Sequence, residues 1–212
     1  MERQEKINKY VNEICAIALD PKHGYSQENR DGDPDFDCSS LVLHCLSIAG
    51  IDARCKGATY TGNMYSALKK CGFEVVTGDG EKGDIYLTPN SHVLIYIGDK
   101  TVCHAVEDEN GKAKGAKKGD QTGKEIRMEV VNNLDSYKYH LRLKGGTTGK
   151  KGIVTNCYYL NMRQGANGNS AIVRVLSKGQ IFDIVKEGKD WTLIEVHGKQ
   201  GYINNAYWEV VV

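Results

Sequence analysis

Hydrophobic residues recur at helical spacing in three places in the first third of the chain. The first predicted helix covers about residues 2–19 and is amphipathic. Its apolar positions are Ile7, Tyr10, Val11, Ile14 and Ala18. The second begins at Cys38, repeats apolar residues at positions 41, 42, 45, 46 and 49, and stops at Gly50. A third helical stretch is expected over about residues 62–71, ending before Gly72.

The pattern then changes to short runs rich in β-branched and aromatic residues. These runs predict strands over residues 73–76, 84–88, 92–97, 101–106, 125–131 and 137–143. Helices that precede a set of antiparallel strands indicate an α+β domain, with the N-terminal helices packed on the sheet.

The runs 92–97 and 101–106 flank the turn residues 98–100 and read as a β-hairpin. With a three-residue loop, His104 falls opposite Leu94, and His92 and His104 become diagonal neighbours on one face. A two-residue loop would place the two histidines on opposite faces, so the expectation depends on register.

A glycine- and lysine-rich segment at residues 145–152 predicts a linker between two domains. Beyond it, short strands alternate with turn residues, which predicts an all-β barrel at 153–212 after a catalytic domain at 1–144. A second glycine- and lysine-rich excursion, at 110–124, reads either as a solvated hairpin tip or as a rim of an active site.

Cys38 is the candidate nucleophile because it opens a helix. Asp37 or Ser39 is expected to cap that helix, and the first turn is expected to lower the thiol pKa. His92 would serve as the base and His104 would orient it, with Glu107 or Asp108 as alternative partners.

Tyr25 lies in the loop that leads to the Cys38 helix. Its hydroxyl is a candidate to stabilise an oxyanion beside the Cys38 backbone N–H, and an ordinary half-buried tyrosine is the alternative.

Charge and cysteine content narrow the class of protein. The chain has 28 basic and 27 acidic side chains, which gives no attraction to nucleic acid, although residues 145–212 carry a net charge of +3. No segment approaches the length of a membrane span, and the N-terminal helix is not a signal peptide. Seven cysteines without framework spacing indicate free thiols and synthesis in a reducing cytoplasm.

No metal or other cofactor is expected. The carboxylates of residues 31–37 alternate as in a calcium loop, but Phe36 and Val42 stand where an EF-hand has glycine and glutamate. There is no Cys-x-x-Cys pair for zinc.

Taken together, these residues resemble the NlpC-type superfamily of cell-wall cysteine peptidases. The resemblance is carried by Asp37-Cys38-Ser39-Ser40, Gly83-Asp84-Ile85, His92 and His104. It implies a papain-like fold, a Cys-His-His triad with Tyr25 nearby, and hydrolysis of an amide bond in the peptidoglycan stem peptide. That bond is either D-γ-glutamyl to the diamino acid or N-acetylmuramoyl to L-alanine. Ser40 replaces a frequent glycine, as in the phage amidase branch.

The tail resembles bacterial SH3-like cell-wall-binding domains. The resemblance implies wall contacts from Tyr158, Tyr159, Tyr207 and Trp208, and places Trp191 and Tyr202 in the core. The two resemblances together fit a monomeric endolysin that is made in the host cytoplasm, is released by a separate pore and acts on the wall. The alternatives are a cysteine peptidase or acyltransferase with another substrate, and a catalytically inert wall-binding protein.

Overall fold

The chain forms two compact units, residues 1–144 and 145–212. The computed structural model describes residues 3–145 and 150–211. Residues 146–149 of the predicted linker lie outside the described residues, and its last two, Lys151 and Gly152, belong to the first strand of the second unit. The barrel therefore begins earlier than the glycine and lysine content indicated.

Three helices open the first unit: α1 (Arg3–Leu19), α2 (Cys38–Ile48) and α3 (Thr61–Lys70). Helix α1 buries the apolar face that its spacing predicted. Helix α2 is buried over residues 39–43, 45 and 46, and Asp37 is its N-cap. The Asp37 side chain accepts a hydrogen bond from the Ser40 N–H, and the Ser40 hydroxyl accepts one from the Asp37 N–H, so the helix start is fixed from both sides.

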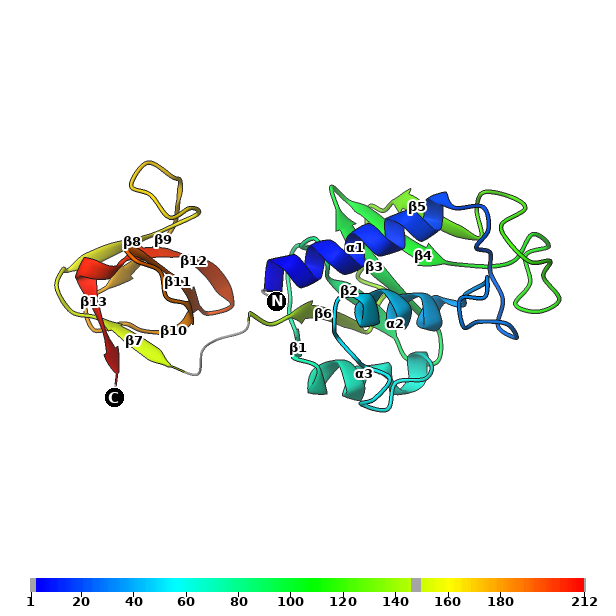
Figure 1. Ribbon diagram of the computed structural model, residues 1–212, viewed down its shortest axis with the longest axis horizontal. Coiled ribbons are helices and arrows are strands. Elements are labelled where there is room, and N and C mark those ends of the chain that lie inside the picture. The colour runs from blue at the N-terminus through cyan, green and yellow to red at the C-terminus, as the bar shows by residue number, and fades with distance from the viewer. Residues whose placement is uncertain (1–2, 146–149, 212) are drawn as a thin grey trace. The chain divides into compact units, whose positions relative to one another are not determined.

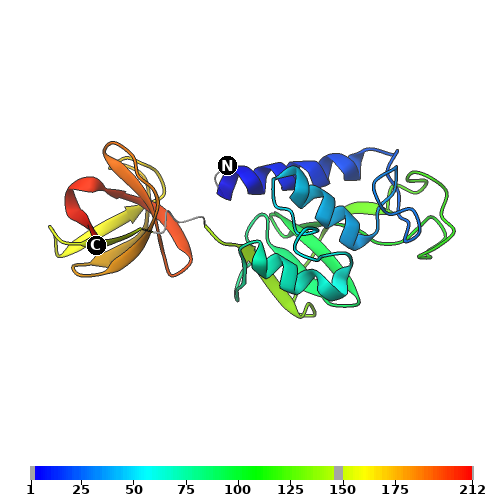
Figure 2. The same ribbon diagram turned by 60° about the horizontal axis from the view of Figure 1, so that its bottom comes forward.

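The helices cover one side of a six-stranded antiparallel sheet (Figure 1, Figure 2). Its strands are β1 (Phe73–Val75), β2 (Ile85–Thr88), β3 (His92–Gly98), β4 (Thr101–Ala105), β5 (Ile126–Val130) and β6 (Tyr139–Leu143). Their order across the sheet is β1-β6-β2-β3-β4-β5. The predicted α+β class, with the N-terminal helices packed on an antiparallel sheet, is confirmed.

The two faces of this sheet have different partners. Val93, Ile95 and Cys103 point into the main core beneath the helices. Because side chains alternate along a strand, Leu94 and Val102 point the other way, into a smaller cluster around Tyr86. We refer to this second side as the outer face. His92 is two residues from Leu94 on β3, and His104 is two residues from Val102 on β4, so both histidines also lie on the outer face.

The β3–β4 hairpin reaches the predicted register by a different route. Gly98 pairs with Thr101, so the turn has two residues, Asp99 and Lys100, both with positive φ. A bulge between Tyr96 and Gly98 then shifts the pairing, so that Ile95 pairs with Cys103. Continued by one residue, this register places His104 opposite Leu94, as predicted, although the predicted loop length was wrong.

Two long loops lie side by side at one end of the first unit (Figure 1). Asp35 Oδ1 accepts hydrogen bonds from the N–H groups of Gly24 and Gly119, each at 2.9 Å. The Asp120 N–H donates to the Pro21 carbonyl at 2.9 Å. A Cβ on Gly24 would collide with the Gly119 carbonyl. The excursion at 110–124 is therefore attached to the loop that carries Tyr25, and is not a free hairpin tip.

The second unit is a seven-stranded antiparallel barrel with strand order β13-β7-β10-β11-β12-β8-β9. The strands are β7 (Lys151–Val154), β8 (Tyr159–Arg163), β9 (Ile172–Ser177), β10 (Ile181–Lys186), β11 (Trp191–Val196), β12 (Lys199–Asn204) and β13 (Trp208–Val211). Aliphatic side chains and Phe182 fill the core, with Trp208 packed against it. Trp191 and Tyr202 are not members of that core, so their predicted place was wrong.

Candidate active site

Cys38 occupies the first residue of α2, which packs against β3. Burial raises the pKa of the Cys38 thiol to about 11, and the Asp37 carboxylate adds to this rise. Backbone hydrogen bonds from Val93, Ser39 and Cys38 itself act in the opposite direction but do not compensate. The predicted lowering of this pKa at the helix start is therefore outweighed by desolvation, and the resting group is a neutral thiol.

The two predicted histidines lie in direct contact. His92 Nε2 is 2.7 Å from His104 Nδ1, and the rings meet edge to face at 5.0 Å between centroids. On its other side, His104 Nε2 is 2.9 Å from Glu129 Oε1, and Arg127 Nε is 3.0 Å from Glu129 Oε2. A continuous polar chain therefore runs from Arg127 through Glu129 and His104 to His92.

Burial keeps both histidines neutral near pH 7. Burial, together with the neighbouring His104, lowers the pKa of His92 to about 4, although Glu129 opposes the shift. Burial also lowers the pKa of His104, against the opposing effect of the Glu129 carboxylate. Neutral imidazoles carry one N–H donor and one acceptor each, so their hydrogen bonds fix their tautomers.

The alternative partners Glu107 and Asp108 form no hydrogen bond with His92 among the described residues. Asp108 Oδ1 accepts hydrogen bonds from the N–H groups of Asn110 and Lys112 and organises that turn. Glu107 is exposed. The side chain that contacts His92 is His104.

Glu129 was not among the candidates from the sequence. His104 pairs with Arg127 across β4 and β5, so Glu129, two residues on, is a diagonal neighbour of His104 on the same face. The same diagonal rule that linked His92 to His104 would have found it. The register between β4 and β5 is hidden, however, by the long excursion that separates these strands.

Two tyrosines lie within electrostatic range of the Cys38 thiol. The Tyr25 ring is buried, its N–H donates to Glu125 Oε2 at 2.8 Å, and its hydroxyl accepts from Gln27 at 3.2 Å. Burial raises the pKa of Tyr25, and the proximity of Cys38 contributes to the rise. Tyr137, which the sequence analysis missed, has its pKa raised to about 12 by burial, with Cys38 and Glu129 contributing.

Within the described residues, no group of three or more His, Cys, Asp or Glu side chains is placed to hold a metal ion. All seven cysteines are free thiols. No helix in the described part of the chain is long and apolar enough to cross a membrane.

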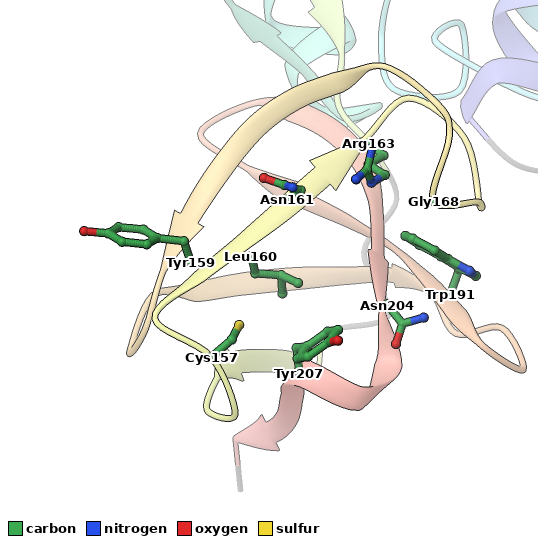
Figure 3. Close-up of a pocket in the computed structure, with 9 residues that line it drawn as sticks. All are labelled: Cys157, Tyr159, Leu160, Asn161, Arg163, Gly168, Trp191, Asn204 and Tyr207. Carbon is green, nitrogen blue, oxygen red and sulfur yellow. The ribbon is translucent and has the colours of Figure 1, made fainter.

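The barrel has a cavity of about 520 Å³ of its own, lined by nine residues (Figure 3). Arg163, Trp191, Asn204 and Tyr207 surround it, and the Tyr159 ring extends from its edge. Of the four predicted wall contacts, Tyr159 and Tyr207 line this cavity. The other two do not: Tyr158 is 81% exposed, and Trp208 packs on Phe182. Trp191 was missed because its place was predicted to be the core.

Comparison with known proteins assigns each unit. Residues 4–101 match the endolysin-like domain, a range that contains Tyr25, Cys38 and His92 but ends before His104. Residues 159–209 match the bacterial SH3 domain. No curated protein matches the chain.

Similar solved structures are distant. The P60 domain of the M. avium subspecies paratuberculosis antigen MAP1204 is 15% identical, with a TM-score of 0.40, over 66% of this chain and 96% of that one. Ly7917 is 13% identical, with a TM-score of 0.38, over 93% of this chain and 92% of that one. Ly7917 with the hydrolyzing product of MDP is 14% identical, with a TM-score of 0.37, over 96% and 97%. At these scores the assignment depends on the two family models: the chain carries an endolysin-like domain followed by a bacterial SH3 domain.

Proposed function

We propose that this chain is a peptidoglycan hydrolase that cleaves an amide bond of the stem peptide with Cys38 as nucleophile. The observation that carries the proposal is the chain of hydrogen bonds from Glu129 through His104 to His92. Val93, the next residue along the strand, makes a backbone hydrogen bond to the Cys38 thiol at the start of α2. The endolysin-like and SH3 matches support the choice of peptidoglycan over another amide substrate.

The Glu129 carboxylate sets the direction of proton transfer. Because a carboxylate only accepts hydrogen bonds, Glu129 Oε1 accepts one from His104 Nε2–H, so the neutral His104 ring keeps its proton on Nε2 and has its lone pair on Nδ1. His104 Nδ1 accepts the His92 Nε2–H in turn, which leaves His92 Nδ1 unprotonated. A neutral imidazole in this tautomer can take the proton of the Cys38 thiol.

The reaction then follows from a neutral thiol and a neutral base. The Cys38 sulfur attacks the amide carbonyl carbon as its proton passes to His92, and a tetrahedral oxyanion forms. The Cys38 N–H and the Tyr25 hydroxyl donate hydrogen bonds to that oxyanion. The C–N bond breaks as His92 protonates the leaving amine, and a thioester remains. Water, deprotonated by His92, hydrolyses the thioester and restores the thiol.

The barrel cavity supplies a place to hold the wall polymer. Trp191 and Tyr207 offer aromatic surface, and Arg163 and Asn204 offer hydrogen-bond donors. Full-length Trp191→Ala is expected to be retained less on purified walls while its activity on a soluble muropeptide stays the same. Equal retention would remove the cavity from wall binding.

The predicted monomeric state and the need for a separate pore stay predictions.

Two substitutions of the nucleophile test the reaction. Cys38→Ala and Cys38→Ser are expected to abolish clearing of purified Gram-positive walls and to leave sedimentation with those walls intact. Unchanged clearing would remove Cys38 from the mechanism. Clearing by neither wild type nor variant would favour another substrate or an inert wall-binding protein.

The bond that is broken is a separate question with two candidates. Mass spectrometry of digested walls distinguishes them, because an amidase releases intact stem peptides without sugar. A D-γ-glutamyl endopeptidase instead leaves L-alanyl-D-glutamate on the glycan.

A further inference from the structure

A groove of about 770 Å³ lies on the outer face of the six-stranded sheet. Residues 75–80, after β1, form one wall, and residues 131–138, between β5 and β6, form the other. Tyr86 and His140 line it between these walls, with their rings stacked at 4.3 Å between centroids. Its volume is in the range of small-molecule and peptide sites.

One side chain joins this groove to the catalytic residues. Tyr137 lines the groove, and its ring centroid is 6.1 Å from that of Tyr86 and 6.4 Å from that of His92. Tyr137 is also within electrostatic range of Cys38. A ligand in the groove would therefore extend from the reacting atoms past Tyr137.

The groove offers charges of both signs that the fold does not consume. Among the described residues, the side chains of Asp79, Asp135 and Lys100 form no hydrogen bond or ion pair, and all three are exposed. Nearby, Asp84 is fully occupied, by Arg142 at 2.7 Å and His140 at 2.6 Å. The free carboxylates and ammonium are thus distinct from the charges that hold the sheet together.

We propose that this groove binds the peptide part of the substrate, at a residue that carries a free amine. The inference rests on the proposed function and deepens it. Asp79 and Asp135 attract the amine, Lys100 attracts a carboxylate of the same peptide, and the tyrosine rings cover its aliphatic part. An uncharged glycan strand would make no use of the two carboxylates.

The first test is kinetic and uses a soluble muropeptide. The double variant Asp79→Asn/Asp135→Asn is expected to raise KM roughly fivefold, with kcat within twofold, because exposed charge pairs contribute modestly to binding. Asp99→Asn is the matched control. It removes one charge from the exposed β3–β4 turn outside the groove, in a positive-φ position that asparagine tolerates, and should change neither constant. An unchanged KM in the double variant overturns the proposal.

The second test measures binding without turnover. Full-length Cys38→Ala, with and without the two groove substitutions, is titrated with synthetic L-Ala-γ-D-Glu-L-Lys-D-Ala and its Nε-acetyl form. The diaminopimelate versions are tested in the same way. Acetylation is expected to weaken binding roughly fivefold in Cys38→Ala and not at all in the triple variant, since both changes remove one interaction. Equal losses in both proteins would place the amine outside the groove. Stronger binding of an amino-sugar oligomer than of the peptide would show that the groove takes the glycan. Either result overturns the proposal. Wild-type clearing of walls, measured in parallel, tells a failure of the groove from a failure of the proposed function.

Discussion

Two carboxylate–histidine pairs lie on the outer face of the same sheet, and they differ in what lies beyond the histidine. Glu129 contacts His104, and His104 is hydrogen-bonded to His92, whose neighbour Val93 makes a backbone hydrogen bond to the Cys38 thiol. Asp84 contacts His140 at 2.6 Å, but His140 stacks on Tyr86, and the Asp84 carboxylate also binds Arg142. The first pair leads towards Cys38, the proposed nucleophile, and the second belongs to a hydrogen-bonded network with Arg142.

The surroundings of the two carboxylates explain this difference. Asp84 is 1% exposed. Burial raises its pKa, but hydrogen bonds from Arg142 and His140 outweigh that and hold the pKa below its ordinary value. Glu129 is partly exposed and lies at the edge strand. A histidine next to a carboxylate therefore identifies a catalytic relay only when its second nitrogen leads towards a reacting atom.

The largest effect on kcat should come from replacing His92, and His140 provides the comparison. His92→Ala removes the proposed general base and is expected to lower kcat on walls about a thousandfold. His140→Ala, the matched change in the other pair, should leave kcat within threefold and lower the melting temperature. Because His140 also lines the groove, a loss of activity in this variant should appear in KM. A large loss of kcat in a folded His140→Ala protein would contradict the contrast between the pairs.

Asp84→Asn should act on stability. It removes the charge that faces Arg142 in a buried network, which typically costs roughly 3 kcal/mol of unfolding free energy. Urea denaturation measures the loss, and kcat per folded molecule should stay near wild type. Because the folded pKa of Asp84 is lowered, its stabilising effect is present above the unfolded pKa and disappears as the pH falls towards the folded value. The variant should therefore lose this part of the acid sensitivity of unfolding.

Glu129→Gln should act on catalysis with little change in stability. The amide can donate as well as accept, so the tautomers of His104 and His92 are no longer fixed, and kcat should fall roughly tenfold to a hundredfold. Glu129→Asp, which keeps the charge, should recover part of the loss. If Glu129→Gln and Glu129→Asp lower kcat by the same small factor, Glu129 has no role in orienting the histidines.

Much of this site could be predicted because its parts are local in sequence. The helix at Cys38, its Asp37 cap and the β3–β4 hairpin each follow from a short window of residues. Even there the hairpin turn is one residue shorter than predicted, and only the bulge before Gly98 restores the register. The pattern of apolar residues fixes which face a strand buries, and this constraint is stronger than the preference for a turn length.

The missed residues come from distant segments or from burial. Glu129 and Tyr137 lie beyond the excursion at 110–124, so no local pattern relates them to His104 or Cys38. Trp191 was placed in the barrel core by the resemblance to bacterial SH3-like domains, but aliphatic residues and Phe182 already fill that core. The pKa of Cys38 was misjudged in direction, since desolvation depends on packing that the sequence does not reveal.

The smallest effect is in the pH dependence of the rate, which should respond to a change in the Glu129–His104 pair and not to one in the Asp84–His140 pair. His92 must be neutral to act as base, so kcat/KM should stay level from neutral pH down to about pH 5 and fall as the pH approaches the His92 pKa of about 4. The Glu129 charge raises that pKa, so Glu129→Gln should move the acid limb to lower pH by less than one unit. Asp84→Asn should not move it.

The free energy of unfolding also falls between about pH 6.5 and 4, because an unfolded histidine binds a proton that folded His92 does not. Circular dichroism at each pH therefore accompanies the rates, and a limb near pH 6.5 in folded wild type would show that His92 is not desolvated.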